Sequence, residues 1–160
     1  TGRPMLLWHE ANRAPWDMVL MFGGGLALAM GMSESGLAQW MGQMLLPLSA
    51  VPLFAMALIL VGFVIVITEF ASNIAAASAI MPVVAALVAA MGADPILLAL
   101  PAAFAATWGF MLPSGTGPNA IAWSTGHVDL GRVLKAGFLL DVSGALLITA
   151  IVWAVAFLTG

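Results

Sequence analysis

Long apolar runs that alternate with short polar stretches make up most of this chain. One run covers residues 15–32 and another covers residues 136–158. Each is close to the length of about 20 residues that a helix needs to cross the hydrocarbon core of a bilayer. The pattern therefore predicts a membrane-spanning helix in both places.

A short segment after the first run has a different pattern. In residues 37–46 the apolar side chains recur at helical spacing, whereas Gln39 and Gln43 fall off that face. This arrangement is typical of an amphipathic helix that lies in the membrane interface.

Residues 51–91 form two apolar arms around a polar tip, Thr68-Glu69-Phe70-Ala71-Ser72-Asn73. Each arm has 17–18 residues, at the lower edge of what a membrane crossing needs. Either both arms cross and the tip is a surface turn, or the arms form a re-entrant hairpin whose tip lies inside the membrane. The residues alone favour the ordinary hairpin.

Residues 95–125 contain another apolar run, and Asp94 is placed to cap the helix that begins it. The run is interrupted by Pro113-Ser114-Gly115-Thr116-Gly117-Pro118-Asn119. Because two prolines and two glycines oppose a continuous helix, we expect one helix up to Leu112 and a second piece from Ala120. The freed backbone groups cost several kcal/mol each in hydrocarbon unless protein, water or an ion satisfies them.

Interrupted helices line the ion and anion sites of many transporters. The tip and the interruption offer hydroxyls, amides and carbonyls, and these hard oxygen ligands suit Na⁺ rather than a transition metal. Amides at helix N-termini suit an anionic carboxylate, and with no basic side chain close by in the sequence such an anion would need a co-bound cation. In the alternative interpretation, Ser72 and Asn73 only cap the second arm, the interruption is only a kink, and the chain is a non-transporting membrane subunit.

Two acidic residues, Glu69 and Asp141, lie in or beside apolar segments. Each is a candidate partner for a proton or Na⁺, because acidic groups are costly in lipid. Glu69 stands just before a helix start, and Asp141 follows Lys135 by six residues. These positions favour a capping or interfacial place for Glu69 and an interfacial one for Asp141.

The composition supports a membrane protein. Hydrophobic residues make up 63% of the 160 residues and charged residues 7%, against roughly 45–50% and about 25% in soluble domains. Four basic residues argue against a nucleic-acid partner. With no cysteine, two histidines and no nucleophile–base pair, we expect no enzymatic activity and no organic cofactor.

The few basic residues predict the topology of a multi-pass protein. Arg3 and Arg13 precede the first run, and Arg132 and Lys135 precede the last one. Short loops rich in Lys and Arg are usually cytoplasmic, so we expect both pairs on that side. The chain begins at Thr1 without an initiator Met, and we expect it to be a piece of a longer protein.

The tip and the interruption resemble two signature motifs of the divalent anion/sodium symporter family. Thr68–Asn73, followed by an apolar helix with Pro82, resembles the second Ser-Asn-Thr hairpin of that family. The segments Phe110-Met111-Leu112-Pro113 and Thr116-Gly117-Pro118-Asn119-Ala120-Ile121 resemble the motif at its second broken helix. Phe22–Ala29 and Lys135–Phe138 also match in order and spacing, so the resemblance covers nearly the whole chain.

The resemblance implies an all-α membrane protein with a re-entrant hairpin and a broken helix, corresponding to the second of two inverted repeats. Its partners would be the missing N-terminal repeat, the lipid bilayer and, in the full protein, a second copy in a homodimer of a bacterial inner membrane. The implied substrate-binding residues are Ser72, Asn73, Thr116 and Gly117. The implied Na⁺-binding residues are Thr68, Ala71, Asn73 and Gly115, several of them through backbone carbonyls.

Two positions depart from the family pattern. Ile74 stands where the family has the Thr of Ser-Asn-Thr, which removes one hydroxyl from the substrate site. Gly117 stands where Thr-Pro-Pro has its first proline, which loosens the interruption. The resemblance implies sodium-coupled symport with a dicarboxylate as the first choice, while sulfate, a tricarboxylate, arsenite and proton coupling stay open.

Overall fold

The computed structural model describes residues 7, 8, 12, 16–45, 47, 50–113 and 115–159. These residues contain helices and no strand, which confirms the expected all-α fold. The helices are α2 (Trp16–Glu34), α3 (Leu37–Met44), α4 (Leu53–Phe70), α5 (Asn73–Met91), α6 (Pro95–Ala105), α7 (Gly117–Ser124) and α8 (Leu130–Thr159).

Among the described residues, three segments are long and apolar enough to cross a membrane: Leu53–Phe70, Asn73–Met91 and Leu130–Leu158. They correspond to the two arms and to the last apolar run. Helix α2 is not one of the three, so the crossing expected for residues 15–32 stays a prediction. Arg3 and Arg13 lie outside the described residues.

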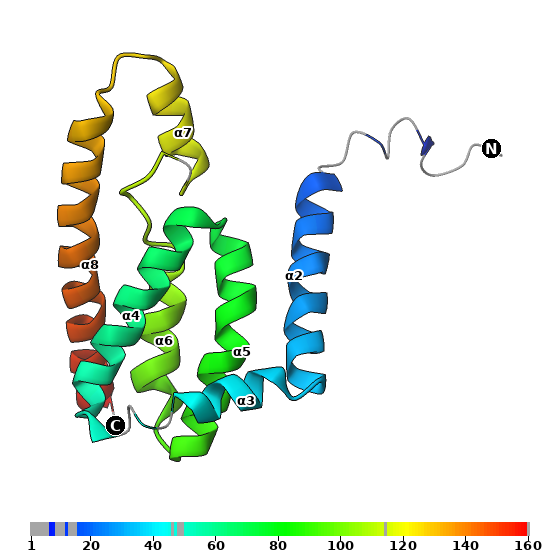
Figure 1. Ribbon diagram of the computed structural model, residues 1–160, viewed down its shortest axis with the longest axis vertical. Coiled ribbons are helices and arrows are strands. Elements are labelled where there is room, and N and C mark those ends of the chain that lie inside the picture. Colours follow the sequence, from blue (N-terminus) through cyan, green and yellow to red (C-terminus); the bar gives the residue numbers. More distant parts are fainter. Residues whose placement is uncertain are drawn as a thin grey trace.

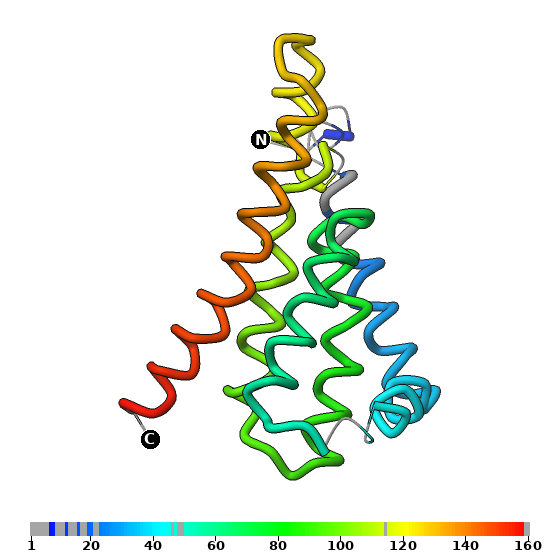
Figure 2. The backbone as a smooth tube through the Cα atoms, turned by 60° about the vertical axis from the view of Figure 1, so that its left-hand side comes forward, coloured from blue at the N-terminus to red at the C-terminus, as the bar shows by residue number. Residues whose placement is uncertain are grey.

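Helix α6 lies between the arms α4 and α5 and packs against both of them as well as against α8 (Figure 1). Helices α2 and α3 cover α5 on the side away from α8 (Figure 1). Helix α8 runs obliquely along the bundle (Figure 2). The two arms are therefore held together by α6, which follows both of them in the sequence.

The apolar core is built around α6, whose Leu98, Ala102 and Ala105 are fully buried. Buried positions on α4 recur every three or four residues, as expected for one stripe of a helix. They are Met56, Ala57, Leu60, Val61, Val64, Ile65, Thr68 and Glu69. Because the stripe ends in Thr68 and Glu69, these two polar side chains of the tip point into the bundle.

The ends of α5 and α6 follow local capping rules. Ser72 Oγ accepts a hydrogen bond from the Ala75 amide at 3.3 Å, and only Ala71 and Ser72 separate α5 from α4. Asp94 Oδ1 accepts one from the Ile96 amide at 2.9 Å, which confirms the expected cap of α6.

The interruption is longer than expected. Helix α6 ends at Ala105 and not at Leu112, and α7 begins at Gly117 and not at Ala120. Pro118 is part of α7, because the first turn of a helix does not use the N–H group that proline lacks. The early end of α6 has a tertiary cause, described next.

Candidate functional site

The polar tip between α4 and α5 is tied to the end of α6. Thr68 is completely buried, and its Oγ1 lies 2.9 Å from Asn73 Oδ1 and 2.8 Å from the Ala106 carbonyl oxygen. A hydroxyl carries one hydrogen, so Thr68 donates to one of these two acceptors at a time. Three uncharged oxygens from the tip and from the start of the interruption therefore converge at one point.

Glu69 holds the interruption directly. Its Oε1 accepts a hydrogen bond from the Met111 amide at 2.7 Å, and its Oε2 accepts one from the Leu112 amide at 2.5 Å. Only 1% of the Glu69 surface is exposed. Both carboxyl oxygens are therefore used inside the bundle, and the level of Glu69 in the membrane stays a prediction.

Asp141 joins the same cluster from α8. Its Oδ1 accepts a hydrogen bond from the Phe110 amide at 3.2 Å, and its carboxyl group lies beside that of Glu69. With 7% of its surface exposed, Asp141 is also buried. Asp141 therefore also faces the bundle, and its level in the membrane stays a prediction.

Two glycines allow the tip and the interruption to touch. A Cβ atom on Gly109 would lie 3.0 Å from Thr68 Cγ2, and one on Gly115 would lie 3.3 Å from Glu69 Oε2. Both distances are short for carbon, so these positions suit glycine. The structure thus brings Thr68, Asn73 and Gly115 to one region, and their binding of Na⁺ stays a prediction.

The other predicted residues lie around this region. Ser72 is exposed, and its hydroxyl caps α5. Thr116 is half-buried, and its Oγ1 accepts a hydrogen bond from the Asn119 amide at 3.4 Å at the start of α7. Gly117 is exposed, and a Cβ built there meets no atom within 4 Å. Both views place α7 at the end of the bundle that carries the tip (Figures 1 and 2).

Ala71 and Ile74 flank the pair Ser72 and Asn73. The Ala71 amide donates to the Ile67 carbonyl at 3.1 Å, which closes the last turn of α4. Ile74 is half-buried, and its Cγ2 would lie 3.7 Å from a Cβ on Gly25. The residue that replaces the family Thr thus faces α2. Ser114 lies outside the described residues.

One face of α8 was missed from the sequence. Gly137, Leu140, Asp141 and Gly144 share a face at helical spacing, and residues 108–111 lie against it. A Cβ on Gly137 would collide with backbone atoms of Phe110 and Met111, and one on Gly144 would collide with the Trp108 ring. An acidic residue between two glycines within an apolar helix could have indicated this face from the sequence, because small residues permit close approach of backbones between membrane helices.

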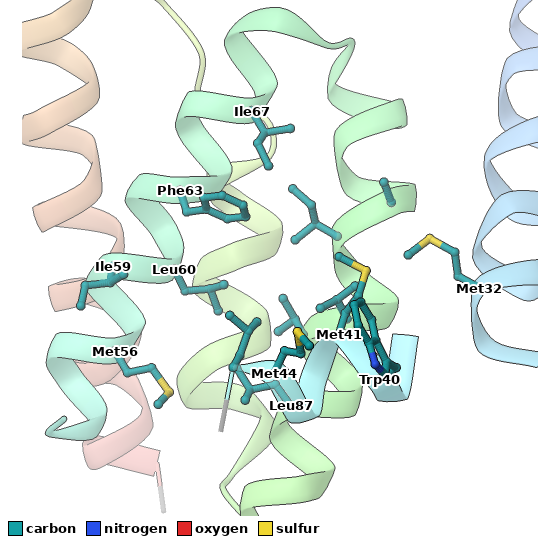
Figure 3. Close-up of a pocket in the computed structure, with 15 residues that line it drawn as sticks. Met32, Trp40, Met41, Met44, Met56, Ile59, Leu60, Phe63, Ile67 and Leu87 are labelled. Carbon is teal, nitrogen blue, oxygen red and sulfur yellow. The ribbon is translucent and has the colours of Figure 1, made fainter. Parts of the chain in front are cut away.

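An apolar cavity lies elsewhere in the bundle. It has a volume of about 520 Å³ between α3, α4 and α5, and its lining is aliphatic, aromatic and methionine side chains, among them Trp40, Met44, Leu60, Phe63 and Leu87 (Figure 3). Such a lining offers no polar ligand for an anion or a cation. The contact between the tip and the interruption is therefore the candidate site.

Comparisons with known proteins agree with the resemblance of the motifs. Residues 3–159 match the family model described as the sodium:sulfate symporter transmembrane region. A sodium-dependent dicarboxylate transporter, SdcS, of Staphylococcus saprophyticus is 41% identical over 146 residues, which cover 91% of this chain and 28% of that protein. SdcS of Staphylococcus aureus strain USA300 is 41% identical over 153 residues, which cover 96% of this chain and 29% of that protein. The chain thus spans less than a third of the length of these relatives.

Proposed function

The chain belongs to the sodium:sulfate symporter family, and from that premise we propose that it is the second inverted repeat of a transporter that couples the uptake of a divalent anion to Na⁺. The complete transporter, as we call it below, is the full-length protein that contains this chain and the first repeat, and we propose that it forms a homodimer in a bacterial plasma membrane. The exposed Arg132 and Lys135 are on the cytoplasmic side in this proposal.

One observation carries the proposal: the convergence of oxygens at Thr68. Its hydroxyl lies within 2.9 Å of Asn73 Oδ1 and 2.8 Å of the Ala106 carbonyl, yet it has one hydrogen for both. A cation can satisfy the second oxygen. A set of neutral, hard oxygens around the buried Thr68 suits Na⁺, and we propose that Thr68, Ala71, Asn73 and Gly115 bind it.

We propose that the anion binds beside this ion, at Ser72, Asn73, Thr116 and Gly117. Ser72 and Thr116 are the N-cap residues of α5 and α7, and the partial positive charge of a helix N-terminus suits an anion. In this proposal no basic side chain contributes, so the positive charge beside the anion comes from Na⁺ and from helix dipoles. This arrangement explains why transport would require the cation.

We also propose that α4 and α5 form a re-entrant hairpin, and that α6, the interruption and α7 together make one broken membrane helix. The tip contacts Asp141 on α8 through Glu69. At a rise of about 1.5 Å per residue, Asp141 lies about 16 Å along the axis of α8 from Leu130, the first residue of that helix. Helix α8 has 30 residues and a length of about 45 Å, against about 30 Å for the hydrocarbon core. A tip at that level supports a position inside the membrane.

The anion itself is proposed from the relatives. Those compared are named dicarboxylate transporters, whereas the family model carries the name of sulfate. We propose a C4-dicarboxylate as substrate and sulfate as the second candidate. Ile74 bears on this choice because it lacks the hydroxyl that the family has there.

The test is uptake of labelled succinate or labelled sulfate into proteoliposomes that contain the complete transporter. We expect succinate to accumulate when a Na⁺ gradient is imposed and not when K⁺ replaces Na⁺. Uptake that is absent for both anions, or equal with and without the gradient, contradicts the proposal. A proton gradient alone is the third condition, since accumulation there would indicate proton coupling.

Asn73→Ala tests the placement of the ion. We expect the Na⁺ concentration for half-maximal uptake to rise by about tenfold or more, which corresponds to about 1.4 kcal/mol. The matched control is Gln43→Ala, which removes an amide from the exposed face of α3. If Asn73→Ala and the control behave alike, the ion is not bound where we propose.

A further inference from the structure

Three consecutive backbone amides in the interruption are held by carboxylates. The Phe110 amide donates to Asp141 Oδ1, and the Met111 and Leu112 amides donate to the two oxygens of Glu69. Glu69 is on α4 and Asp141 is on α8, so two different helices hold the same short segment. These bonds replace the helical ones that residues 110–112 would make if α6 continued.

Both partners in these bonds gain from them. An amide without an acceptor is costly inside a membrane protein, and so is a buried carboxylate without donors. Glu69 and Asp141 are almost fully buried, so their carboxyl oxygens need donors from the protein itself. The cluster therefore stabilises a non-helical backbone at a level where lipid or packed helices surround it.

The held segment leads directly to a proposed Na⁺ ligand. The Gly115 amide donates to the Leu112 carbonyl at 3.1 Å, so a short turn joins the amide held by Glu69 to Gly115. Gly115 also lies against Glu69, because a Cβ atom built on Gly115 would be 3.3 Å from Glu69 Oε2. Any shift of residues 110–112 would move Gly115 relative to Thr68 and Asn73.

We propose that Glu69 and Asp141 are positioning residues that fix residues 110–112 and thereby set the distance between the hairpin tip and Gly115. This inference rests on the proposed function, because it assigns the two acids to the same Na⁺ site without making them ligands. The tip and the interruption then move as one unit, because Glu69 is part of the tip and binds the amides of the interruption.

Glu69→Gln is the central test. Glutamine has nearly the same shape, but one of its two terminal atoms is a donor, so it can accept from the Met111 or the Leu112 amide and not from both. In the complete transporter we expect the Na⁺ concentration for half-maximal uptake to rise by about tenfold, with a much smaller change in the maximal rate. The matched control is Glu34→Gln, an exposed acid at the end of α2.

Hydrogen–deuterium exchange gives a readout that does not depend on transport. We expect the peptide that covers residues 106–116 to exchange faster in Glu69→Gln than in Glu34→Gln, without Na⁺ or substrate. Unchanged exchange together with unchanged Na⁺ dependence overturns the inference. If only the exchange changes, the segment is held as described but does not position the ion, and the inference is also overturned.

Asp141 provides an independent pair of variants, in case Glu69→Gln does not fold. Asp141→Asn keeps an oxygen that accepts from the Phe110 amide, whereas Asp141→Ala keeps none. We expect the alanine variant to need several-fold more Na⁺ than the asparagine variant, and equal Na⁺ dependence of the two overturns the inference. The wild-type protein separates this result from the broader proposal: if its own uptake does not depend on Na⁺, the proposed function fails first.

Discussion

Gly137→Ala is the substitution that most directly probes the close contact between α8 and the interruption. Gly137 is buried, and a Cβ atom there would collide with backbone atoms of Phe110 and Met111. Backbone cannot rotate out of the way as a side chain can. Residues 110–111 must therefore move away from α8, which lengthens the 3.2 Å hydrogen bond from the Phe110 amide to Asp141.

The expected size of the effect follows from opposing contributions. Overpacking a well-filled site costs about 1–3 kcal/mol, and weakening a bond to a buried carboxylate adds to this cost. Alanine regains about 1 kcal/mol in a helix relative to glycine. We expect a net loss of about 1–3 kcal/mol in the free energy of unfolding.

Gly62→Ala is the matched control, because it makes the same chemical change on α4. A Cβ on Gly62 meets no atom within 4 Å, so only the gain in helix propensity, up to about 1 kcal/mol, is expected. Thermal unfolding of the complete transporter in detergent, without Na⁺ or substrate, compares the two variants. The argument is refuted if Gly137→Ala unfolds at the wild-type temperature, or if Gly62→Ala lowers the unfolding temperature as much.

Three further substitutions test other parts of the site. Thr68→Val keeps the shape of the side chain but leaves the Ala106 carbonyl without its donor, so it should lower the free energy of unfolding by about 1–3 kcal/mol and weaken Na⁺ activation of uptake. Thr68→Ser should retain the wild-type stability and the wild-type Na⁺ activation, and equal behaviour of the two variants would show that the hydroxyl is unimportant. Gly117→Pro should be neutral or stabilise the protein by up to about 1 kcal/mol in thermal unfolding. The reason is that Thr116 is already extended, at φ −138° and ψ 149°, as a residue before proline should be. A lower unfolding temperature would contradict this expectation. Ile74→Thr restores the hydroxyl of the family motif and should lower the succinate concentration for half-maximal uptake; no change in that concentration would place position 74 outside the substrate site.

The positions of the helices could be predicted from the sequence where neighbouring residues determine them. The two arms follow from runs of apolar residues, and their ends follow from caps such as Ser72 and Asp94, which act on amides two or three residues away. The short helix Leu37–Met44 follows from its apolar spacing. In each case the chain segment itself contains the information.

The interruption was predictable in its existence but not in its extent. Its prolines and glycines suggested a break from Pro113 onward, yet α6 already ends at Ala105. The amides that leave the helix bond to Glu69 and Asp141, which are 42 or 43 and 31 residues away in the sequence. No local propensity reports such partners, so the end of this helix is set by tertiary contacts.

The contacts of Glu69 and Asp141 were not indicated by the pattern of either segment alone. An acid in an apolar run, judged by itself, is costly to bury, and the interface is its cheapest place. An interrupted helix, judged by itself, leaves amides that are costly to bury as well. Each cost is reduced when the two features meet, because the carboxyl oxygens need donors and the amides need acceptors. An acidic residue in one apolar segment and a helix break in another are therefore best considered together, as two halves of one buried contact.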